Sequence, residues 1–510
     1  MRKRTGLVLD TLTLSSAKYK HVNQIKQYLR TLGGQRFILI IVLRVVDASM
    51  SLVSLGLIYP LTTYFLDRQE FFEQLLEYLP FLTDYDDTQK TLIFGSIMAG
   101  YLLFRYVFGL WALNLTVRFS VNQRFKWVNI LANYYFLKDY LILKSDKSGK
   151  LVSEWYNDTY NASVFLTLLI TIVNDLTFVL VFLLVIIASS PLFGLWASLI
   201  FAIVLVLYYL LKNRDLNKQS SKKVVFIQQT MSILTDIILH IRDVKIFQLY
   251  EIAKAQVKEA TDELGSVFIA NSKLSKKTTL YTELFIISMV ASIFLVIGLG
   301  LLNAESLNIS LLVLYVALGF RSLNYLTKVL TSFNKLKIEF ASFRDVSLKL
   351  KSASNHPVVI KNDNISDLNL DRIRFSNFSF NYPKGKSIFK NLNIEIPLSK
   401  HILVVGDSGS GKSTFLDILV GLYSEYEGEM TIMNRSHEKV VPDISLFGYV
   451  SQSVGLFGRS FEECICGLHQ YEKEKFMQIL ALCDLEKVYE DQKESFSVSS
   501  FSGGERLRVA

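Results

Sequence analysis

Six long apolar stretches constrain the fold of this chain more than any other feature. Each approaches or exceeds the ~20 residues that a helix needs to cross a lipid bilayer. The chain has 510 residues, of which 51% are hydrophobic, and its mean hydropathy of +0.32 is high for a soluble protein of this size. We therefore predict that much of the chain lies in a membrane. The stretches span residues 37–66, 91–117, 164–189, 191–212, 278–302 and 307–330.

The charges between these stretches predict their orientation. The segment before the first stretch is basic, and the loops 118–163 and 213–277 are rich in Lys and Arg. The loop 67–90 is acidic, and the loop 303–306 carries no positive charge. Cytoplasmic loops of membrane proteins carry an excess of Lys and Arg, so six spans with both termini in the cytoplasm fit every loop. The net charge of +9 then reflects topology, and we expect no nucleic-acid partner.

The chain divides into three predicted segments. Residues 1–344 form a membrane domain, and helical periodicity in its two long cytoplasmic loops predicts that the spanning helices extend into the cytoplasm. Residues 345–368 are polar and are interpreted as a linker. Residues 369–510 begin with strand-rich sequence and form the third segment.

The third segment contains a phosphate-binding motif. The sequence GDSGSGKST, residues 406–414, follows the apolar run 401–405 and precedes the apolar run 415–420. A strand, this glycine-rich loop and a helix form the context in which backbone N–H groups cradle phosphates. An ordinary Gly/Ser-rich turn is the alternative. The residues predicted to contact the nucleotide are Gly406, Ser408, Gly409, Gly411, Lys412, Ser413 and Thr414.

Individual roles follow from the chemistry of such a loop. Gly409 and Gly411 would supply the bend. Lys412 would reach the β- and γ-phosphates, and the hydroxyl of Ser413 would help to hold Mg²⁺. The sequence therefore predicts ATP and Mg²⁺ as ligands.

With these motifs, the chain resembles the half-size ABC exporters, in which a membrane domain precedes a nucleotide-binding domain. The resemblance implies an all-α domain of six membrane helices followed by an α/β P-loop NTPase domain. It also implies that Tyr382 stacks on adenine and that Gln452 approaches Mg²⁺ and the attacking water. Gln452 and Lys412 would then be the catalytic residues. Stacking on an aromatic ring suits any base, so Tyr382 alone carries little information.

A second short motif supports the resemblance. In the family, a signature sequence closes on the γ-phosphate held by the opposite subunit, which implies a dimer of two half-transporters, here a homodimer. The matching residues are Ser502, Gly503, Gly504 and Glu505. Phe501 and Glu505 replace the Leu and Gln usual at the edges of this motif.

The family places two further elements after the signature. These are an apolar strand ending in Asp-Glu, which completes Mg²⁺ coordination, and a switch histidine. The sequence ends at Ala510 before either, so we expect an incomplete reading of a longer gene whose product is an ABC-type transport ATPase. The alternative is a non-hydrolysing accessory subunit.

Three arginines suggest what is transported. Arg44, Arg105 and Arg321 lie within apolar stretches, each about 10 Å from the cytoplasmic face of a ~30 Å core. Such guanidinium groups at one depth could receive a phosphate or pyrophosphate head group. Alternatively they extend to the interface or pair internally, as Arg44 could with Asp47.

Two local similarities refine the substrate class. Residues 320–330, and the first stretch with Asp47, Tyr59 and Pro60, are similar to exporters that flip lipid-linked oligosaccharides. The resemblance implies ATP-driven flipping of such a glycolipid across the cytoplasmic (inner) membrane. Drug, lipid or peptide export is the alternative.

Overall fold

The computed structural model describes residues 33–189, 221–298, 309–355, 370–382, 387–423, 425–436, 438–440, 446–452, 454–467, 471–493 and 496–509. The chain forms two units, which are treated separately below. The first unit comprises Met1–Lys138 and Leu143–Val359. The second comprises Ile360–Ala510 together with the short segment Asp139–Ile142.

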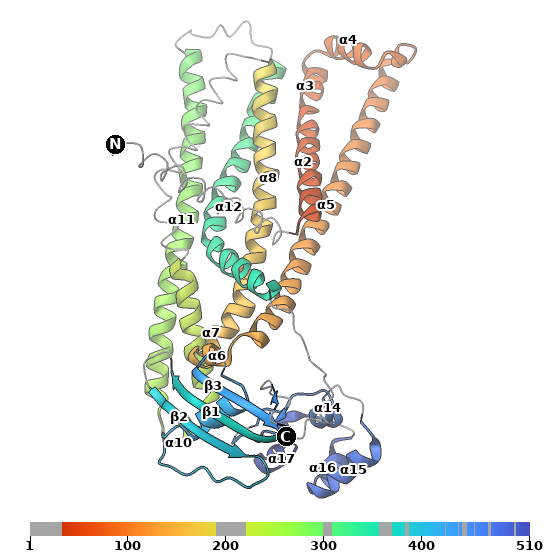
Figure 1. Ribbon diagram of the computed structural model, residues 1–510. Coiled ribbons are helices and arrows are strands. Elements are labelled where there is room, and N and C mark those ends of the chain that lie inside the picture. The colour runs from red at the N-terminus through yellow and green to blue at the C-terminus, as the bar shows by residue number, and fades with distance from the viewer. Residues whose placement is uncertain are drawn as a thin grey trace, which may run out of the picture. The chain divides into compact units, whose positions relative to one another are not determined.

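The first unit is helical (Figure 1). Its helices are α2 (Gln35–Gly56), α3 (Ile58–Leu66), α4 (Arg68–Tyr78), η1 (Pro80–Leu82), α5 (Asp87–Leu137), α7 (Ser148–Val152), the π-helical turn η2 (Ser153–Asn157), α8 (Asp158–Ser189), α10 (Ile241–Ile246), α11 (Tyr250–Gly298) and α12 (Ile309–Asn355). Residues 221–239 are also helical, and α6 (Tyr140–Ser145) crosses the boundary between the units.

Three of the described helical stretches are long and apolar enough to cross a membrane: Gln35–Leu66, Asp87–Phe136 and Ser148–Val185. They contain the predicted spans 37–66 and 91–117 and most of the predicted span 164–189. The predicted span 191–212 lies outside the described residues. Of the other two, 278–302 is helical through Gly298, and 307–330 is helical from Ile309. The total of six spans stays a prediction.

Several helices far exceed the thickness of a bilayer. α5 has 51 residues, α11 has 49 and α12 has 47. At 1.5 Å per residue they measure about 76, 73 and 70 Å, more than twice the ~30 Å hydrocarbon core. Each helix therefore carries polar turns well beyond any apolar segment.

The predicted outer loop between the first two stretches is itself structured. Pro60 cannot donate a backbone hydrogen bond to Gly56, four residues earlier, and the first helix breaks between α2 and α3. Asp67 then caps α4 by accepting from the N–H groups of Gln69 and Glu70, both at 3.0 Å. Leu82 is fully buried and packs in one cluster with Phe71 and Phe72 of α4, which holds the loop together.

The core of the first unit lies between α2, α5, α8 and α12. The rings of Phe165 and Phe343 stack at 4.5 Å, and Trp127 packs beside them. A second cluster joins α2, α8 and α12, and in it Phe178 of α8 stacks on Tyr325 of α12 at 3.9 Å. Aromatic pairs of this kind add to the energy of apolar burial. The first cluster therefore holds all four helices together, and the second adds contacts between α2, α8 and α12.

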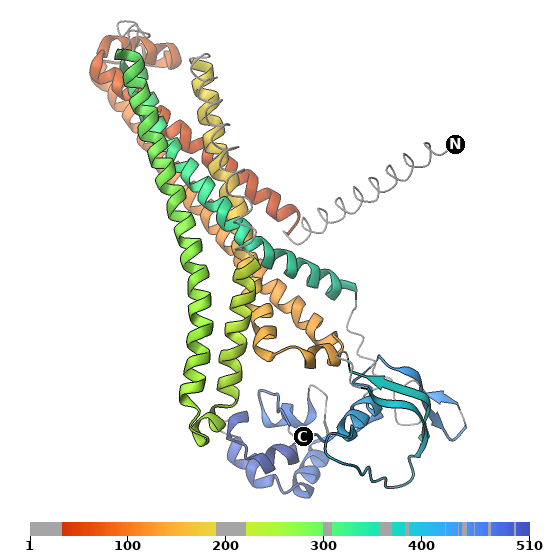
Figure 2. The ribbon, with the colours of Figure 1, turned by 90° about the vertical axis from the view of Figure 1, so that its left-hand side faces the viewer.

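Residues 221–239 and α11 run side by side and are joined through α10 (Figure 2). The hydroxyl of Thr230 donates to the carbonyl of Ala260 at 3.3 Å across this pair. A buried ion pair, Lys223 Nζ to Glu339 Oε1 at 2.6 Å, ties residues 221–239 to α12.

The predicted linker begins later than its polar sequence indicated. Residues 345–355 remain helical because Val346 and Ser347 are fully buried.

The second unit contains a small antiparallel sheet in the order β2-β1-β3-β4. Its strands are β1 (Leu370–Asn381), β2 (Ser387–Pro397), β3 (Glu427–Asn434) and β4 (Lys439–Val440). Phe375, Phe378 and Phe380 of β1 are buried and face α13 (Lys412–Leu419) through contacts with Phe415 and Ile418 in one cluster. This sheet and helix form the core that holds the phosphate loop.

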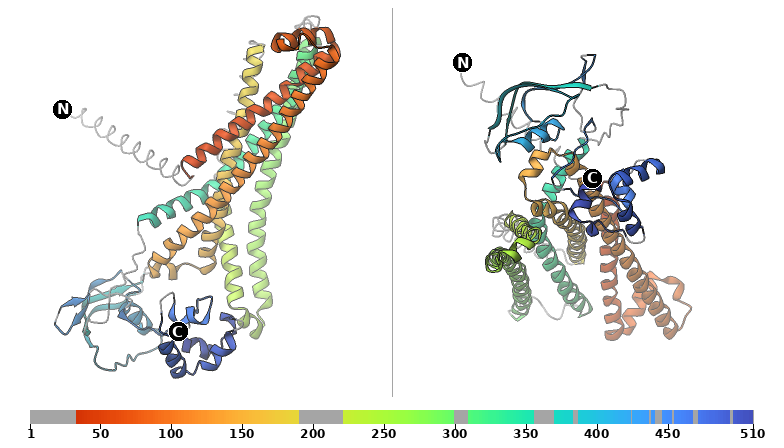
Figure 3. Two further views of the ribbon diagram at one scale, coloured as in Figure 1. Left: turned by 90° about the vertical axis from the view of Figure 1, so that its right-hand side faces the viewer. Right: turned by 90° about the horizontal axis from the view of Figure 1, so that it is seen from below.

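A helical part completes the second unit (Figure 3). It consists of α14 (Phe461–Cys466), α15 (Lys473–Leu482), α16 (Glu486–Gln492), η6 (Val498–Ser500) and α17 (Gly503–Val509). Its core includes Phe461, Phe476, Leu480 and Phe501. Phe501, which departs from the family's usual Leu, is therefore a core residue whose larger ring is accommodated by packing against Phe461.

The strand predicted at residues 401–405 is not formed, so this prediction was wrong. The residues have no regular secondary structure, and none of the described strands pairs with them. Leu403 is 86% exposed and Val405 is 80% exposed. A strand needs a partner for its backbone hydrogen bonds, and an apolar run alone does not supply one.

Candidate nucleotide-binding site

The phosphate loop has the backbone that its glycines predict. Gly409 and Gly411 adopt positive φ angles of +81° and +99°, which side chains with a Cβ rarely tolerate. A Cβ at Gly411 would also lie 2.5 Å from Ile388 Cγ2. Gly411 is the N-cap of α13 and no side chain caps that end, so the first N–H groups of the helix are available to an anion.

Lys412 is held inside the loop. Its Nζ donates to the carbonyls of Gly406 and Asp407 at 2.7 and 2.8 Å. These bonds fold the lysine over the loop that is predicted to hold the phosphates. Binding of a phosphate would exchange one or both carbonyls for charged oxygens, which accept stronger hydrogen bonds from an ammonium group.

The hydroxyl residues of the loop differ in their surroundings. Ser408 and Ser413 are exposed, and Ser413 lies in the first turn of α13, where its hydroxyl could bind Mg²⁺. Thr414 is buried and its Oγ1 lies 3.0 Å from the hydroxyl of Tyr382. The predicted adenine-stacking residue is therefore attached to the phosphate-loop helix.

Tyr382 is half-buried, with its ring edge-on to Phe380 at 5.3 Å and to Tyr423 at 6.2 Å. Gln452 is exposed at the end of the segment 446–452. Its exposed amide and the Ser413 hydroxyl are the oxygen ligands that Mg²⁺ prefers. The residues thus fit the predicted nucleotide and metal, and bound Mg²⁺ would neutralise charge on the phosphate oxygens.

The signature residues open α17. Ser502 and Glu505 form a reciprocal cap: Ser502 N–H donates to Glu505 Oε2 at 2.7 Å, and Glu505 N–H donates to Ser502 Oγ at 3.3 Å. The bond from the Ser502 N–H lowers the pKa of the Glu505 carboxyl. Gly503 and Gly504 are exposed with open space around them. Glu505, which stands where the family usually has Gln, therefore still caps the start of α17.

A carboxylate that the sequence analysis did not single out lies behind the loop. Asp417, on α13, is only 8% exposed. It accepts hydrogen bonds from the hydroxyls of Tyr423 at 3.2 Å and Tyr449 at 3.3 Å. Burial and the Asp417 carboxylate raise the pKa of Tyr449. Burial, followed by the neighbouring Tyr382 and Asp417, raises the pKa of Tyr423. A lone Asp within the apolar run FLDIL was the available signal, because such a residue requires partners.

The segment Asp139–Ile142 was also not predicted to join this unit. Leu141 is buried in the same cluster as Phe380 and Ile418. The ring of Tyr140 lies 5.9 Å from that of Tyr423. A short piece of the loop predicted to be cytoplasmic therefore contributes to the core beneath the phosphate loop.

Two of the three arginines suggested as substrate contacts are described in full, and both contact α2. Arg44 Nη1 pairs with Asp47 Oδ2 at 3.0 Å, the internal pair foreseen as an alternative. Arg105 Nη2 donates to the hydroxyl of Ser51 at 2.6 Å. The Nε atoms of both arginines are buried and have no hydrogen-bond partner among the residues that the structure describes. Arg321 lies on α12, but its side chain is outside the described residues.

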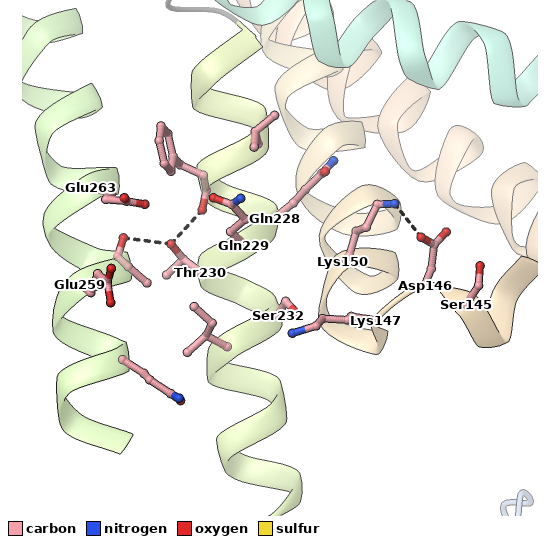
Figure 4. A pocket seen from close by; sticks show the side chains of 15 residues that line it. Ser145, Asp146, Lys147, Lys150, Gln228, Gln229, Thr230, Ser232, Glu259 and Glu263 are labelled. Carbon is pink, nitrogen blue, oxygen red and sulfur yellow. Dashed lines mark hydrogen bonds and ion pairs between the residues drawn. The ribbon is translucent and has the colours of Figure 1, made fainter. Parts of the chain in front are cut away.

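The first unit also contains a cavity of about 680 Å³ (Figure 4). Residues of 145–150, 225–233 and 256–263 line it. Its lysines are already paired: Lys150 with Asp146 at 2.7 Å and Lys147 with Asp236 at 3.2 Å. The cavity contains none of the residues predicted for nucleotide chemistry, and the candidate nucleotide site lies in the second unit.

Residues 389–510 match the ABC transporter family. The chain is 25% identical over 309 residues to the mitochondrial iron-sulfur clusters transporter of Candida albicans, which covers 55% of this chain and 41% of that protein. It is 30% identical over 148 residues to the lacticin-481/lactococcin-DR transport/processing ATP-binding protein of Lactococcus lactis, covering 28% of this chain and 20% of that protein.

A third relative is an ABC transporter ATP-binding protein of Clostridium tetani, 30% identical over 167 residues, which cover 30% of this chain and 37% of that protein. The chain thus spans less than half the length of each of these relatives. The matches and the loop geometry agree. Residues 389–510 are an ABC transporter domain, and it follows a helical region with candidate membrane helices.

Proposed function

We propose that the protein is one half of an ATP-driven exporter in the cytoplasmic membrane, with its N-terminus and nucleotide domain in the cytoplasm. Two copies bind two ATP molecules, each between Gly406–Thr414 of one copy and Ser502–Glu505 of the other. The observation that carries the proposal is the phosphate loop, whose positive-φ glycines precede a helix N-terminus that no side chain caps.

Each predicted residue has a defined part in hydrolysis. Lys412 holds the β- and γ-phosphates, Ser413 and Gln452 hold Mg²⁺, and Gln452 orients the attacking water. Tyr382 stacks on adenine. The second copy supplies Ser502 and the backbone of Gly503 and Gly504 to the γ-phosphate.

The two-copy arrangement has a direct test. A dimer of Lys412→Ala with Ser502→Arg contains one site with both faces intact, whereas each variant alone contains two damaged sites. Dimers isolated through two different affinity tags should therefore regain ATP-dependent closure, read by cross-linking or by hydrolysis. Mixed dimers that stay as inactive as each variant alone would contradict a shared site.

The proposed substrate is a lipid-linked oligosaccharide or related glycolipid. Support comes from Arg44 on α2 and from Arg105 on α5, which bonds to Ser51 of α2. Each retains a buried Nε–H that has no partner within the described parts of the chain. An unsatisfied buried guanidinium donor favours a phosphate oxygen as its acceptor. Arg321 would complete the set from α12.

Transport in proteoliposomes tests this substrate. A fluorescent polyprenyl-pyrophosphate glycan should be moved in an ATP-dependent way, and Arg105→Gln and Arg321→Gln should weaken its binding. Unchanged binding would remove the arginines from the proposal. The relatives include a transporter named for iron-sulfur clusters and one named for lacticin, so movement of a peptide in place of the glycolipid would assign this chain to a different exporter class.

A further inference from the structure

Asp417 connects two parts of the nucleotide site that are far apart in sequence. Asp417 lies four residues after Ser413 on α13, about one helical turn. The two residues are therefore on the same side of the helix, about 6 Å apart along its axis. Its two carboxylate oxygens are divided between two tyrosines: Oδ2 accepts from Tyr423 and Oδ1 from Tyr449. A single buried side chain thus holds two other segments against the helix.

Tyr449 belongs to the segment that carries Gln452. The segment 446–452 contains no strand and, apart from a single 3-10 residue, no helix. Packing of Leu446 and Phe447 on the sheet core and the hydrogen bond from the Tyr449 hydroxyl to Asp417 attach this segment to the rest of the unit. Gln452 lies three residues beyond this bond and is exposed, so the bond links the segment that carries Gln452 to α13.

Tyr423 fixes the other side of the carboxylate. It is 1% exposed and its ring stacks on Phe380 at 5.2 Å. It also contacts Tyr140 of the segment Asp139–Ile142. Because this tyrosine is immobilised by packing, its hydroxyl holds Asp417 in one orientation, and the second oxygen remains directed at Tyr449.

We propose that Asp417 is a positioning residue of the metal site: through Tyr449 it sets the distance between Gln452 and Ser413. This inference rests on the proposed function, in which Gln452 and Ser413 hold Mg²⁺. Mg²⁺ requires nearly ideal geometry at 2.0–2.1 Å, so a small displacement of one ligand weakens the site. Loss of a group that orients a metal ligand typically costs 10- to 100-fold in metal affinity.

The test uses Mn²⁺ as a spectroscopic substitute for Mg²⁺ with the full-length protein in lipid nanodiscs. Electron paramagnetic resonance measures Mn²⁺ affinity at saturating ATP, and displacement of a fluorescent ATP analogue measures nucleotide affinity without divalent cation. Tyr449→Phe and Asp417→Asn should each weaken Mn²⁺ binding by about tenfold, while ATP affinity without metal changes less than twofold. The double variant Asp417→Asn with Tyr449→Phe should bind Mn²⁺ no more weakly than either single variant.

Two references make the result decisive. Tyr426→Phe removes a hydroxyl from a tyrosine that packs on Phe378 in the same core and should leave Mn²⁺ affinity unchanged. Gln452→Ala reports loss of the ligand itself. If Gln452→Ala weakens Mn²⁺ binding but Tyr449→Phe and Asp417→Asn do not, the positioning role is wrong and the nucleotide site stands. If Gln452→Ala has no effect, the assignment of the metal ligands, and with it this inference, is wrong.

Discussion

The hydroxyl of Tyr382 lies 3.0 Å from Thr414 Oγ1, so the proposed adenine-stacking residue is bonded to the helix that follows the phosphate loop. Since Thr414 is buried and Tyr382 is half-buried, this contact fixes the height of the aromatic ring relative to the loop. Base stacking and phosphate binding are thereby connected through one hydrogen bond.

Substitutions of Tyr382 separate these two contributions. Tyr382→Phe keeps the ring and loses a hydrogen bond of about 0.5–1.5 kcal/mol, so ATP affinity should fall by about threefold. Tyr382→Ala also loses stacking of about 1–3 kcal/mol, and affinity should fall by tenfold or more. Equilibrium binding of ATP to both variants measures the difference. Equal losses in Phe and Ala variants would show that the ring does not stack on the base.

Gly411→Ala should disable the loop. The new Cβ would face Ile388 Cγ2 at 2.5 Å, in a backbone conformation with φ of +99°. Gly421→Ala is the matched control, because Gly421 also has positive φ, +81°, but nothing within 4 Å of the added Cβ. Gly421→Ala should lower the stability of the fold by about 1–2 kcal/mol with little change in ATP affinity. Gly411→Ala should lower ATP affinity at least tenfold. ATP binding that is alike in both variants would refute the steric role of Gly411.

The buried pair between Lys223 and Glu339 should stabilise the first unit. Both side chains are nearly buried, at 11% and 12% exposure, so Lys223→Ala leaves a buried carboxylate without its partner. Such a loss costs about 3–5 kcal/mol and should appear as a lower unfolding temperature in detergent.

The exposed pair between Lys147 and Asp236 provides the comparison. Its side chains are 65% and 42% exposed, and exposed pairs contribute about 0–1 kcal/mol, so Lys147→Ala should have little effect. Restoration of stability by exchanging Lys223 and Glu339 would support a direct pair. Equal effects of Lys223→Ala and Lys147→Ala would contradict the importance of burial.

The local conformation of the two motifs was easier to predict from sequence than the fold around them. The phosphate loop and the capped signature depend on local chemistry, namely glycines that permit positive φ and a Ser-Glu pair that closes a helix end. Such features are visible in a few consecutive residues. The strand predicted at 401–405 was wrong, because a strand also depends on the presence of a partner elsewhere in the chain, which an apolar run does not reveal.

Long-range contacts were the other feature that sequence patterns did not predict. Leu141 lies on α6, within the segment 118–163 predicted to be a cytoplasmic part of the membrane domain, yet it packs in the core of the second unit. Asp417 and Tyr449 are 32 residues apart, and neither motif spacing nor helical periodicity connects them. Contacts of this kind are set by packing of the whole unit and require the structure.

Equilibrium binding of ATP to the full-length protein and to Lys412→Ala tests the central claim most directly. Lys412 donates to two loop carbonyls, and its charge should contribute to phosphate binding. Lys439→Ala removes an exposed lysine paired with Glu429 in the same unit and serves as the control. We predict saturable binding that Lys412→Ala weakens more than tenfold and that Lys439→Ala leaves unchanged. ATP binding to Lys412→Ala with the affinity of the unaltered protein would contradict a nucleotide site at Gly406–Thr414.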